Sequence, residues 1–120
     1  TLDAAYNDAE GVTAAFNRNL ITRLNRELRT RIDPNSFAHT AFFVPARSRI
    51  EMHLRALVPQ TIEIDDHVFT LAKGETIHTE NSAKFDLSTV DSLANASGFQ
   101  RIKSWSDPQN RFLVSWCAVA

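Results

Sequence analysis

Residues 50–58 read IEMHLRALV, and their regular change of polarity sets the expected fold class. Apolar side chains at Ile50, Met52 and Leu54 alternate with polar ones such as Glu51. A period of two is typical of a strand with one buried face, because successive side chains of a strand point to opposite sides. The stretch therefore predicts a half-buried strand near the middle of the chain.

A long amphipathic helix is expected before this strand. Between residues 10 and 31 the apolar side chains recur at three- and four-residue steps, which indicates a helix with one buried face. Asn7 or Asp8 is expected to cap its start. Asp33-Pro34 is expected to end it, because proline disfavours helical backbone at the residue before it, and a short turn should follow.

Shorter strands are expected after the alternating stretch. Residues 61–64 and 67–71 flank Asp65-Asp66 and predict a β-hairpin. Residues 76–79, which follow a turn around Gly74, predict one further strand.

The last third of the chain has a different pattern. Ser88, with Asp91 in the first turn, is typical of a capped helix start, and Gly98 supplies the left-handed residue that ends many helices. Residues 99–105 and 111–119 then predict two strands joined by a turn. The whole order of elements predicts an α+β fold.

Composition narrows the class of protein. Thirteen basic and fourteen acidic side chains among 120 residues leave a formal net charge of -1, so a nucleic-acid partner is not expected. The single cysteine, Cys117, has no internal disulfide partner, which favours a reducing, cytoplasmic compartment. No stretch approaches the roughly 18 apolar residues of a membrane span, and the first residues lack the pattern of a signal peptide.

Common catalytic motifs are absent from the sequence. The four histidines form no helical His-x-x-x-His pair and have no acidic or cysteine partner at zinc-ligand spacing, so no metal site is expected. Neither a Gly-x-Ser-x-Gly elbow nor a Gly-x-Gly-x-x-Gly loop occurs. No catalytic residue and no cofactor-binding residue is therefore predicted in this chain.

Residues 74–85, GETIHTENSAKF, contain the most suggestive polar cluster. Glu80 and Ser82 are expected just past the end of the strand at 76–79. A carboxylate that accepts hydrogen bonds and a hydroxyl that accepts or donates them can together hold a planar group with ring nitrogens. The same side chains could instead cap the next helix or decorate a turn. Met52, taken alone, is expected in the core.

Residues 6–17 read YNDAEGVTAAFN, residues 50–54 read IEMHL, and residues 79–85, after Gly74-Glu75, read TENSAKF. In this order, the three segments resemble the histidine-specific methyltransferase family, whose best-known members trimethylate the α-amino group of histidine in ergothioneine biosynthesis. Together they are far more specific than any one of them, and they extend over nearly the whole chain.

The resemblance implies a class I methyltransferase with a substrate-binding domain inserted before the last part of its Rossmann-like sheet. Residues 1–80 would belong to the substrate-binding domain, as a long helix with antiparallel strands. Residues 81–120 would be the C-terminal helix and β-hairpin of the methyltransferase domain. We therefore expect the C-terminal part of an enzyme whose upstream part binds S-adenosyl-L-methionine, with this part inactive alone.

Four residues take roles from the resemblance. Tyr6 matches a tyrosine that binds the substrate carboxylate, Glu80 and Ser82 match the pair that holds the imidazole, and Met52 matches a residue that lines the pocket. The asparagine that would complete the carboxylate clamp has no counterpart here. The implied reaction is an in-line attack of a neutral amine on the sulfonium methyl group, which the enzyme assists by alignment.

An interpretation from another class is a stand-alone amino-acid-binding or interaction module without chemistry. Both interpretations imply a small-molecule partner, histidine or a related amino acid. They differ in whether a strand and a glycine-rich turn precede this chain in the gene product. An excised piece would also expose an unpaired sheet edge near residues 112–119, which predicts a dimer or a strand swap.

Overall fold

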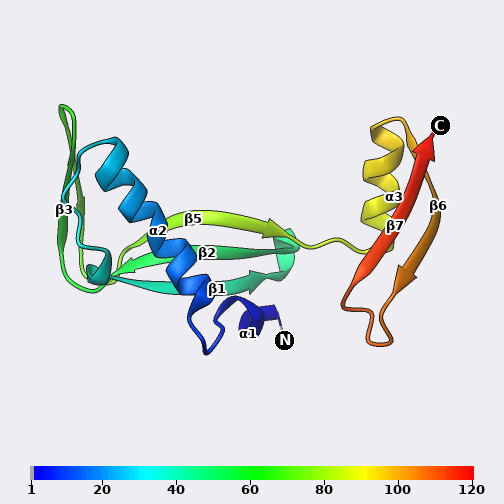
Figure 1. The fold of residues 1–120 in the computed structure, drawn as a ribbon, viewed down its shortest axis with the longest axis horizontal. Coiled ribbons are helices and arrows are strands. Elements are labelled where there is room, and N and C mark those ends of the chain that lie inside the picture. The colour runs from blue at the N-terminus through cyan, green and yellow to red at the C-terminus, as the bar shows by residue number, and fades with distance from the viewer. Residues whose placement is uncertain (1) are drawn as a thin grey trace. The chain divides into compact units, whose positions relative to one another are not determined.

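The alternating stretch forms β2 (Arg49–Ala56), the central strand of a three-stranded antiparallel sheet with the order β1-β2-β5 (Figure 1). The side chains of Ile50, Met52 and Leu54 are fully buried, which confirms the predicted inward face. The computed structural model describes residues 2–120. These fall into two compact units, of which the first ends at Lys84 and the second is Phe85–Ala120.

The strands beside β2 differ from expectation. β1 (Phe37–Val44) was not predicted, because its sequence FAHTAFFV has no clear alternation of polarity. β5 (Thr76–Ala83) continues past the expected end at residue 79, because its ladder with β2 extends as far as Arg49. Glu80 and Ser82 consequently lie within a strand rather than after it.

The ladder between β2 and β5 shifts its register once. His53 pairs with His78, but the preceding residue, Met52, pairs with Glu80, so Thr79 is one extra residue on β5. The hydroxyl of Thr79 donates a 2.9 Å hydrogen bond to the carbonyl oxygen of Met52. Such a β-bulge reverses the faces to which all later side chains of the strand point.

Two helices pack against the sheet of the first unit, α1 (Leu2–Tyr6) against β1 and α2 (Val12–Glu27) against β1 and β2 (Figure 1). Asp8 caps α2 as predicted, since its carboxylate accepts hydrogen bonds from the backbone N–H groups of Val12 at 2.7 Å and Thr13 at 3.0 Å. The start of α2 is thereby fixed relative to Tyr6.

The prediction that this helix continues to about residue 31 was wrong, because α2 ends at Glu27. Arg29 adopts the left-handed conformation, with φ 54°, and the chain turns away. The amide of Asn25 then replaces the lost helical bonds, accepting from the N–H of Ile32 at 2.9 Å and donating to its carbonyl oxygen at 2.7 Å. A helix can end without proline or glycine when a side chain satisfies the freed backbone in this way.

The remaining elements of the first unit include the predicted hairpin. Its strands pair antiparallel, and Asp65 in the turn between them has a φ of 50°. The main core cluster joins α2, the sheet and this hairpin through Ile21, Phe37, Leu54 and Ile62. The elements are η1 (Pro34–Ser36), η2 (Pro45–Arg47), β3 (Gln60–Ile64) and β4 (His67–Leu71).

The second unit has the predicted order of a helix followed by two antiparallel strands. These are α3 (Leu87–Ala96), β6 (Phe99–Ser106) and β7 (Leu113–Val119). Asp86, not Ser88, caps α3, because its carboxylate reaches the backbone N–H of Thr89 at 2.7 Å. Gly98 has a φ of 77° at the end of the helix, as predicted.

The described residues thus form an α+β fold with antiparallel sheets, as expected. None of the described helices combines the length and the apolar character needed to cross a lipid bilayer.

Candidate functional site

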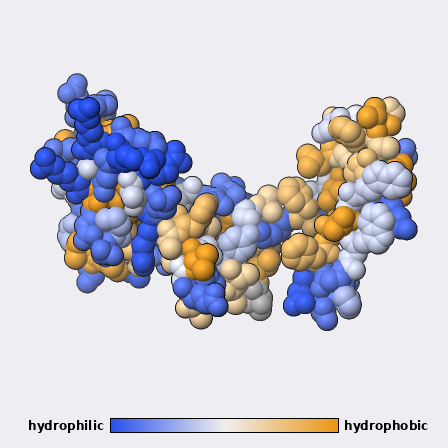
Figure 2. Space-filling view, in the orientation of Figure 1, coloured by the Kyte–Doolittle hydropathy of each residue, from blue (hydrophilic) through white to orange (hydrophobic). Residues whose placement is uncertain are grey.

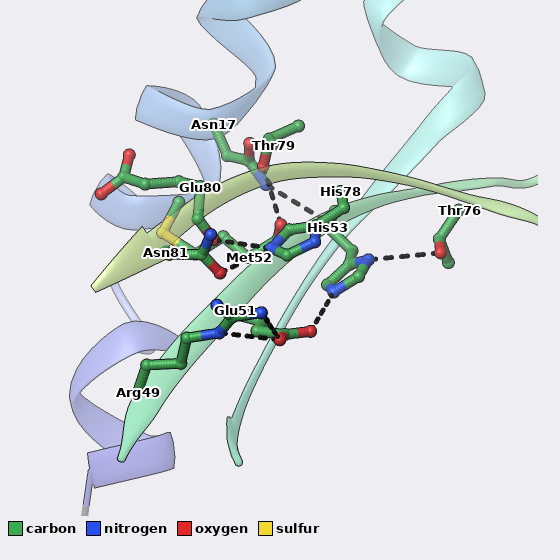
Figure 3. Close-up of polar contacts among 10 residues, drawn as sticks. All are labelled: Asn17, Arg49, Glu51, Met52, His53, Thr76, His78, Thr79, Glu80 and Asn81. Carbon is green, nitrogen blue, oxygen red and sulfur yellow. Dashed lines mark hydrogen bonds and ion pairs between the residues drawn. The ribbon is translucent and has the colours of Figure 1, made fainter. Parts of the chain in front are cut away.

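The bulge at Thr79 places the predicted polar residues on the inner face of the sheet. Glu80 lies opposite Met52, and Ser82 lies opposite Ile50, and both of these β2 residues point inward. If Thr79 itself paired with Met52 in a regular ladder, Glu80 and Ser82 would point to the outer face. Figure 3 shows the Glu80 carboxylate and the sulfur of Met52 on the same side of the strands.

Tyr6 reaches this face from the end of α1. Its ring packs against the small core cluster that contains Met52. Its hydroxyl oxygen lies 2.7 Å from the hydroxyl oxygen of Ser82, across 76 residues of sequence. The structure therefore brings Tyr6, Met52 and Ser82 together.

Lys84 completes a polar triangle with Tyr6 and Ser82. Its ammonium donates to the Tyr6 hydroxyl at 2.6 Å and to the Ser82 hydroxyl at 2.7 Å, and it lies 4.6 Å from the centre of the Tyr6 ring. The ammonium, followed by the Ser82 hydroxyl, lowers the pKa of Tyr6 below its usual value. One ammonium and two hydroxyls are a donor set suited to a carboxylate.

Sequence reasoning missed Lys84, although a signal was present. Ser82 and Lys84 are two residues apart, so continued strand geometry places them on one face. The backbone supports this, because the Lys84 N–H donates to the carbonyl oxygen of Ser48 at 2.7 Å and continues the line of the ladder beyond Ala83.

Glu80 is close to this triangle in register but is not bonded to it. Its side chain is exposed, and among the described residues no hydrogen bond or ion pair engages its carboxylate. The predicted pair of Glu80 and Ser82 therefore shares a face and leaves the carboxylate oxygens of Glu80 open to a ligand.

A buried polar chain fixes the position of Tyr6. Asn17, only 3% exposed, donates from Nδ2 to the carbonyl oxygen of His53 at 3.1 Å and to Nδ1 of His39 at 3.0 Å. The other ring nitrogen of His39, Nε2, lies 2.7 Å from the carbonyl oxygen of Tyr6. Because a carbonyl only accepts, Nε2 carries the proton. The chain connects α2, β2, β1 and α1 directly behind the triangle.

A mainly apolar cavity lies elsewhere in the first unit. Its volume is about 430 Å³, and its walls are mainly apolar side chains of α2, the sheet and the hairpin, such as Leu24, Ile62 and Ile77. None of the four predicted substrate residues lines it. Since an amino acid needs charged and polar contacts, this cavity does not fit the predicted ligand.

Residues 1–119 match the model of a protein family described as histidine-specific methyltransferase, SAM-dependent. The chain is 40% identical over 116 residues to the histidine N-alpha-methyltransferase of Mycobacterium tuberculosis, and 40% identical over 113 residues to that of Mycolicibacterium smegmatis. These alignments cover 95% and 92% of this chain, but 36% and 35% of the relatives.

The chain thus spans about a third of the length of the curated relatives that it matches. The expected resemblance is confirmed, since the family match extends over nearly every residue and both relatives carry the same description. The chain belongs to the histidine-specific, SAM-dependent methyltransferase family.

Proposed function

We propose that this chain is the C-terminal, substrate-recognition part of a SAM-dependent N-methyltransferase that acts on the α-amino group of histidine or a related amino acid. The observation that carries the proposal is the triangle of Tyr6, Ser82 and Lys84 beside the open carboxylate of Glu80. The names of the two relatives support histidine as the substrate.

The donor set suggests how an amino acid would lie. Tyr6 and Lys84 take the substrate carboxylate, since an ammonium and a phenol both donate to an anion. Glu80 and Ser82 take the imidazole, with the carboxylate accepting from a ring N–H. Met52 forms the apolar floor. An amino acid without ring nitrogens leaves two polar groups unpaired, at a cost of about 1–3 kcal/mol for each group.

The described residues do not fit the cofactor. The three glycines, Gly11, Gly74 and Gly98, lie far apart in the sequence, and each has a positive φ. No glycine-rich loop leads from a strand into a helix, which is the usual cradle for a dinucleotide or adenosyl group. We assign S-adenosyl-L-methionine to the part of the enzyme outside this chain, and expect this chain alone to be inactive.

Exposed apolar side chains of the second unit support its proposed place in a larger sheet. Over α3 and β7 the face seen in Figure 2 is largely apolar, and Trp105, Val114 and Trp116 are about half exposed or more, at 47%, 60% and 58%. Strands of a Rossmann-like sheet are buried on both faces. We propose that the second unit, residues 85–120, closes such a sheet and that the first unit belongs to the substrate-binding domain, with the expected boundary after residue 80 moved to the end of the first unit because β5 runs on to Ala83.

The proposal extends to the setting of the enzyme. A cytoplasmic location and a role in ergothioneine biosynthesis follow from the family resemblance, and the partner is a small molecule. In isolation, the uncovered edge of β7 favours a dimer of the fragment.

The test is an NMR titration of the chain with histidine, and with phenylalanine as the control ligand. We expect histidine to shift the amide signals around Glu80, Ser82 and Tyr6, and Glu80→Gln to abolish the shifts. Glu63→Gln, on the hairpin, removes an exposed carboxylate elsewhere and should change nothing. Equal shifts with phenylalanine, or none at millimolar histidine, contradict a recognition site in this chain.

A second experiment measures methyl transfer by the full-length enzyme. Glu80→Gln should lower kcat/KM for histidine at least about 10-fold, which corresponds to about 1.4 kcal/mol of lost transition-state stabilisation. Unchanged kcat/KM would remove Glu80 from the substrate site.

A further inference from the structure

Three side chains with metal-ligating atoms meet on the outer face of the sheet, away from Met52 and Glu80 (Figure 3). Glu51 and His53 are two residues apart on β2, and His78 is the register partner of His53 on β5. One ligand atom from each lies within 4.8 Å of the other two. The side chains of Glu51 and His53 are only 14% and 12% exposed, so water reaches them poorly.

The two imidazole rings are held in place by stacking. The centres of the His53 and His78 rings are 4.5 Å apart with an angle of 15° between their planes. The ring of Phe42, on β1, stacks on His53 at 5.1 Å and 17°. A ring nitrogen binds a metal ion in the plane of its ring, so the exposed His78 ring turns out of the stack when both rings bind one ion.

The hydrogen bonds of the two histidines leave one nitrogen of each ring available. Nε2 of His78 lies 3.2 Å from the carbonyl oxygen of Glu80 and 2.9 Å from Oδ1 of Asn81, and because both accept, Nε2 carries the proton and Nδ1 keeps its lone pair. Nδ1 of His53 lies 3.2 Å from the hydroxyl of Thr76. A hydroxyl donates or accepts, so it satisfies either tautomer of His53.

The carboxylate of Glu51 has one oxygen occupied and one available. Oε1 accepts from the Arg49 guanidinium at 2.9 Å and 2.5 Å. Oε2 lies 3.3 Å from Nε2 of His53. Two lone pairs at this distance repel each other unless a proton or a cation lies between them, so this is a natural position for either.

We propose that Glu51, His53 and His78 bind one zinc ion on the outer face of the sheet. Two neutral imidazoles and one carboxylate form a donor set that zinc uses in three-residue sites. Each histidine also places its second nitrogen against an outer hydrogen-bond partner, Thr76 or Asn81, as metal-ligating histidines do. The ion replaces the proton between Glu51 and His53.

The proposed zinc site is separate from the proposed substrate-recognition site. Zinc links β2 to β5 beside the bulge at Thr79, directly behind Met52 and Glu80. It therefore stiffens the pair of strands that presents the proposed substrate residues without itself touching the substrate.

The test is a calorimetric titration of the chain with zinc chloride at neutral pH, together with cobalt(II) as a spectroscopic probe. We expect one ion per chain and a visible d–d absorption band with cobalt. Glu51→Gln, His53→Gln and His78→Gln should each weaken zinc binding at least about 10-fold, as is usual when a ligand or its support is lost.

Two control variants separate this site from weak binding by scattered side chains. His67→Gln removes an exposed histidine of the hairpin, and Cys117→Ser removes the thiol, and neither should alter zinc affinity. Circular dichroism checks that every variant folds. His78 is exposed, so His78→Gln decides the matter if His53→Gln fails to fold.

The proposal is overturned by an absence of heat and of a cobalt band in the wild-type chain. It is equally overturned if His78→Gln binds zinc as the wild type does, or if His67→Gln loses as much affinity. NMR of the imidazole nitrogens gives an independent readout, because zinc should shift Nε2 of His53 and Nδ1 of His78 specifically.

Discussion

Met52 on β2 and Glu80 on β5 pair at the one point where the register of the two strands shifts. The extra residue, Thr79, sets the face of everything that follows it on β5. Glu80 and Ser82 thus point inward because of the register of β5 against β2, and not because of their own chemistry.

Deleting Thr79 should remove the bulge and keep histidine binding, because Glu80 then follows His78 directly in a regular ladder and stays opposite Met52 on the inner face. Thr79→Val keeps the extra residue and the shape of the side chain but removes its hydrogen bond to the Met52 carbonyl oxygen. This variant should lose about 0.5–1.5 kcal/mol of unfolding free energy in urea and still bind histidine. Loss of histidine binding by a folded deletion variant would show that Thr79 does more than set the register of β5.

Lys84→Met should return the pKa of Tyr6 towards its usual value, because the ammonium is the largest cause of its lowering. Tyr6 is the chain's one tyrosine, so an ultraviolet pH titration follows it directly. The variant should also bind histidine about 10-fold less tightly, since a charge-assisted hydrogen bond is worth roughly 1.5–3 kcal/mol. Lys103→Met, in the second unit, is the matched control.

The same titration has a consequence for stability. The pKa of Tyr6 is lower in the folded chain than in the unfolded one, so ionised Tyr6 favours folding. This contribution is complete above the unfolded pKa of about 10 and is lost as the pH falls through the folded value. Tyr6→Phe should remove it, and an identical pH profile in that variant would contradict the lowered pKa.

Asp8→Asn should lower Tm by a few degrees at neutral pH and by less in acid. Hydrogen bonds from Thr13, and then from the backbone of Val12, lower the pKa of Asp8 to about 2. The stabilisation by its ionised form is present above the unfolded pKa near 4 and is lost as the pH falls through about 2. Thermal unfolding followed by circular dichroism measures both. Equal losses of Tm at neutral and acidic pH would refute a charge-dependent cap.

Asn17→Ala should cost about 1–3 kcal/mol of unfolding free energy, because it leaves His39 and the carbonyl oxygen of His53 unpaired in a buried place. It should also weaken histidine binding through the loss of support behind Tyr6. Asn19→Ala, on the exposed side of the same helix, should stay within about 0.5 kcal/mol of the wild type. A similar effect of both substitutions would mean that helix propensity, not the buried chain, is responsible.

Local patterns predicted those elements whose cause is local. The alternation of residues 50–58 identified β2, and Asp65-Asp66 between two apolar runs identified the hairpin. β1 was missed because a strand covered by a helix needs no strict alternation. The end of α2 was missed because Asn25 stops it through a contact with Ile32, which no spacing rule contains.

The residues of the candidate sites also divide into those that a local pattern can identify and those that depend on contacts between distant segments. Glu80 and Ser82 were singled out by their own chemistry, whereas Tyr6 and Met52 were identified only by resemblance. The substrate roles of all four stay predictions. No metal site was expected because Glu51 and His53 have no partner at motif spacing. Strand pairing supplies His78 from β5, and register across strands is not a property of any one segment.

The link from His39 to Tyr6 has an evolutionary meaning. His39 holds residue 6 by its main-chain oxygen, so this contact does not depend on the phenol side chain. The identity of residue 6 can therefore change without dismantling what places it. A lineage could exchange the phenol for another group and acquire a different amino-acid preference, with the buried amide and imidazole behind it unaltered.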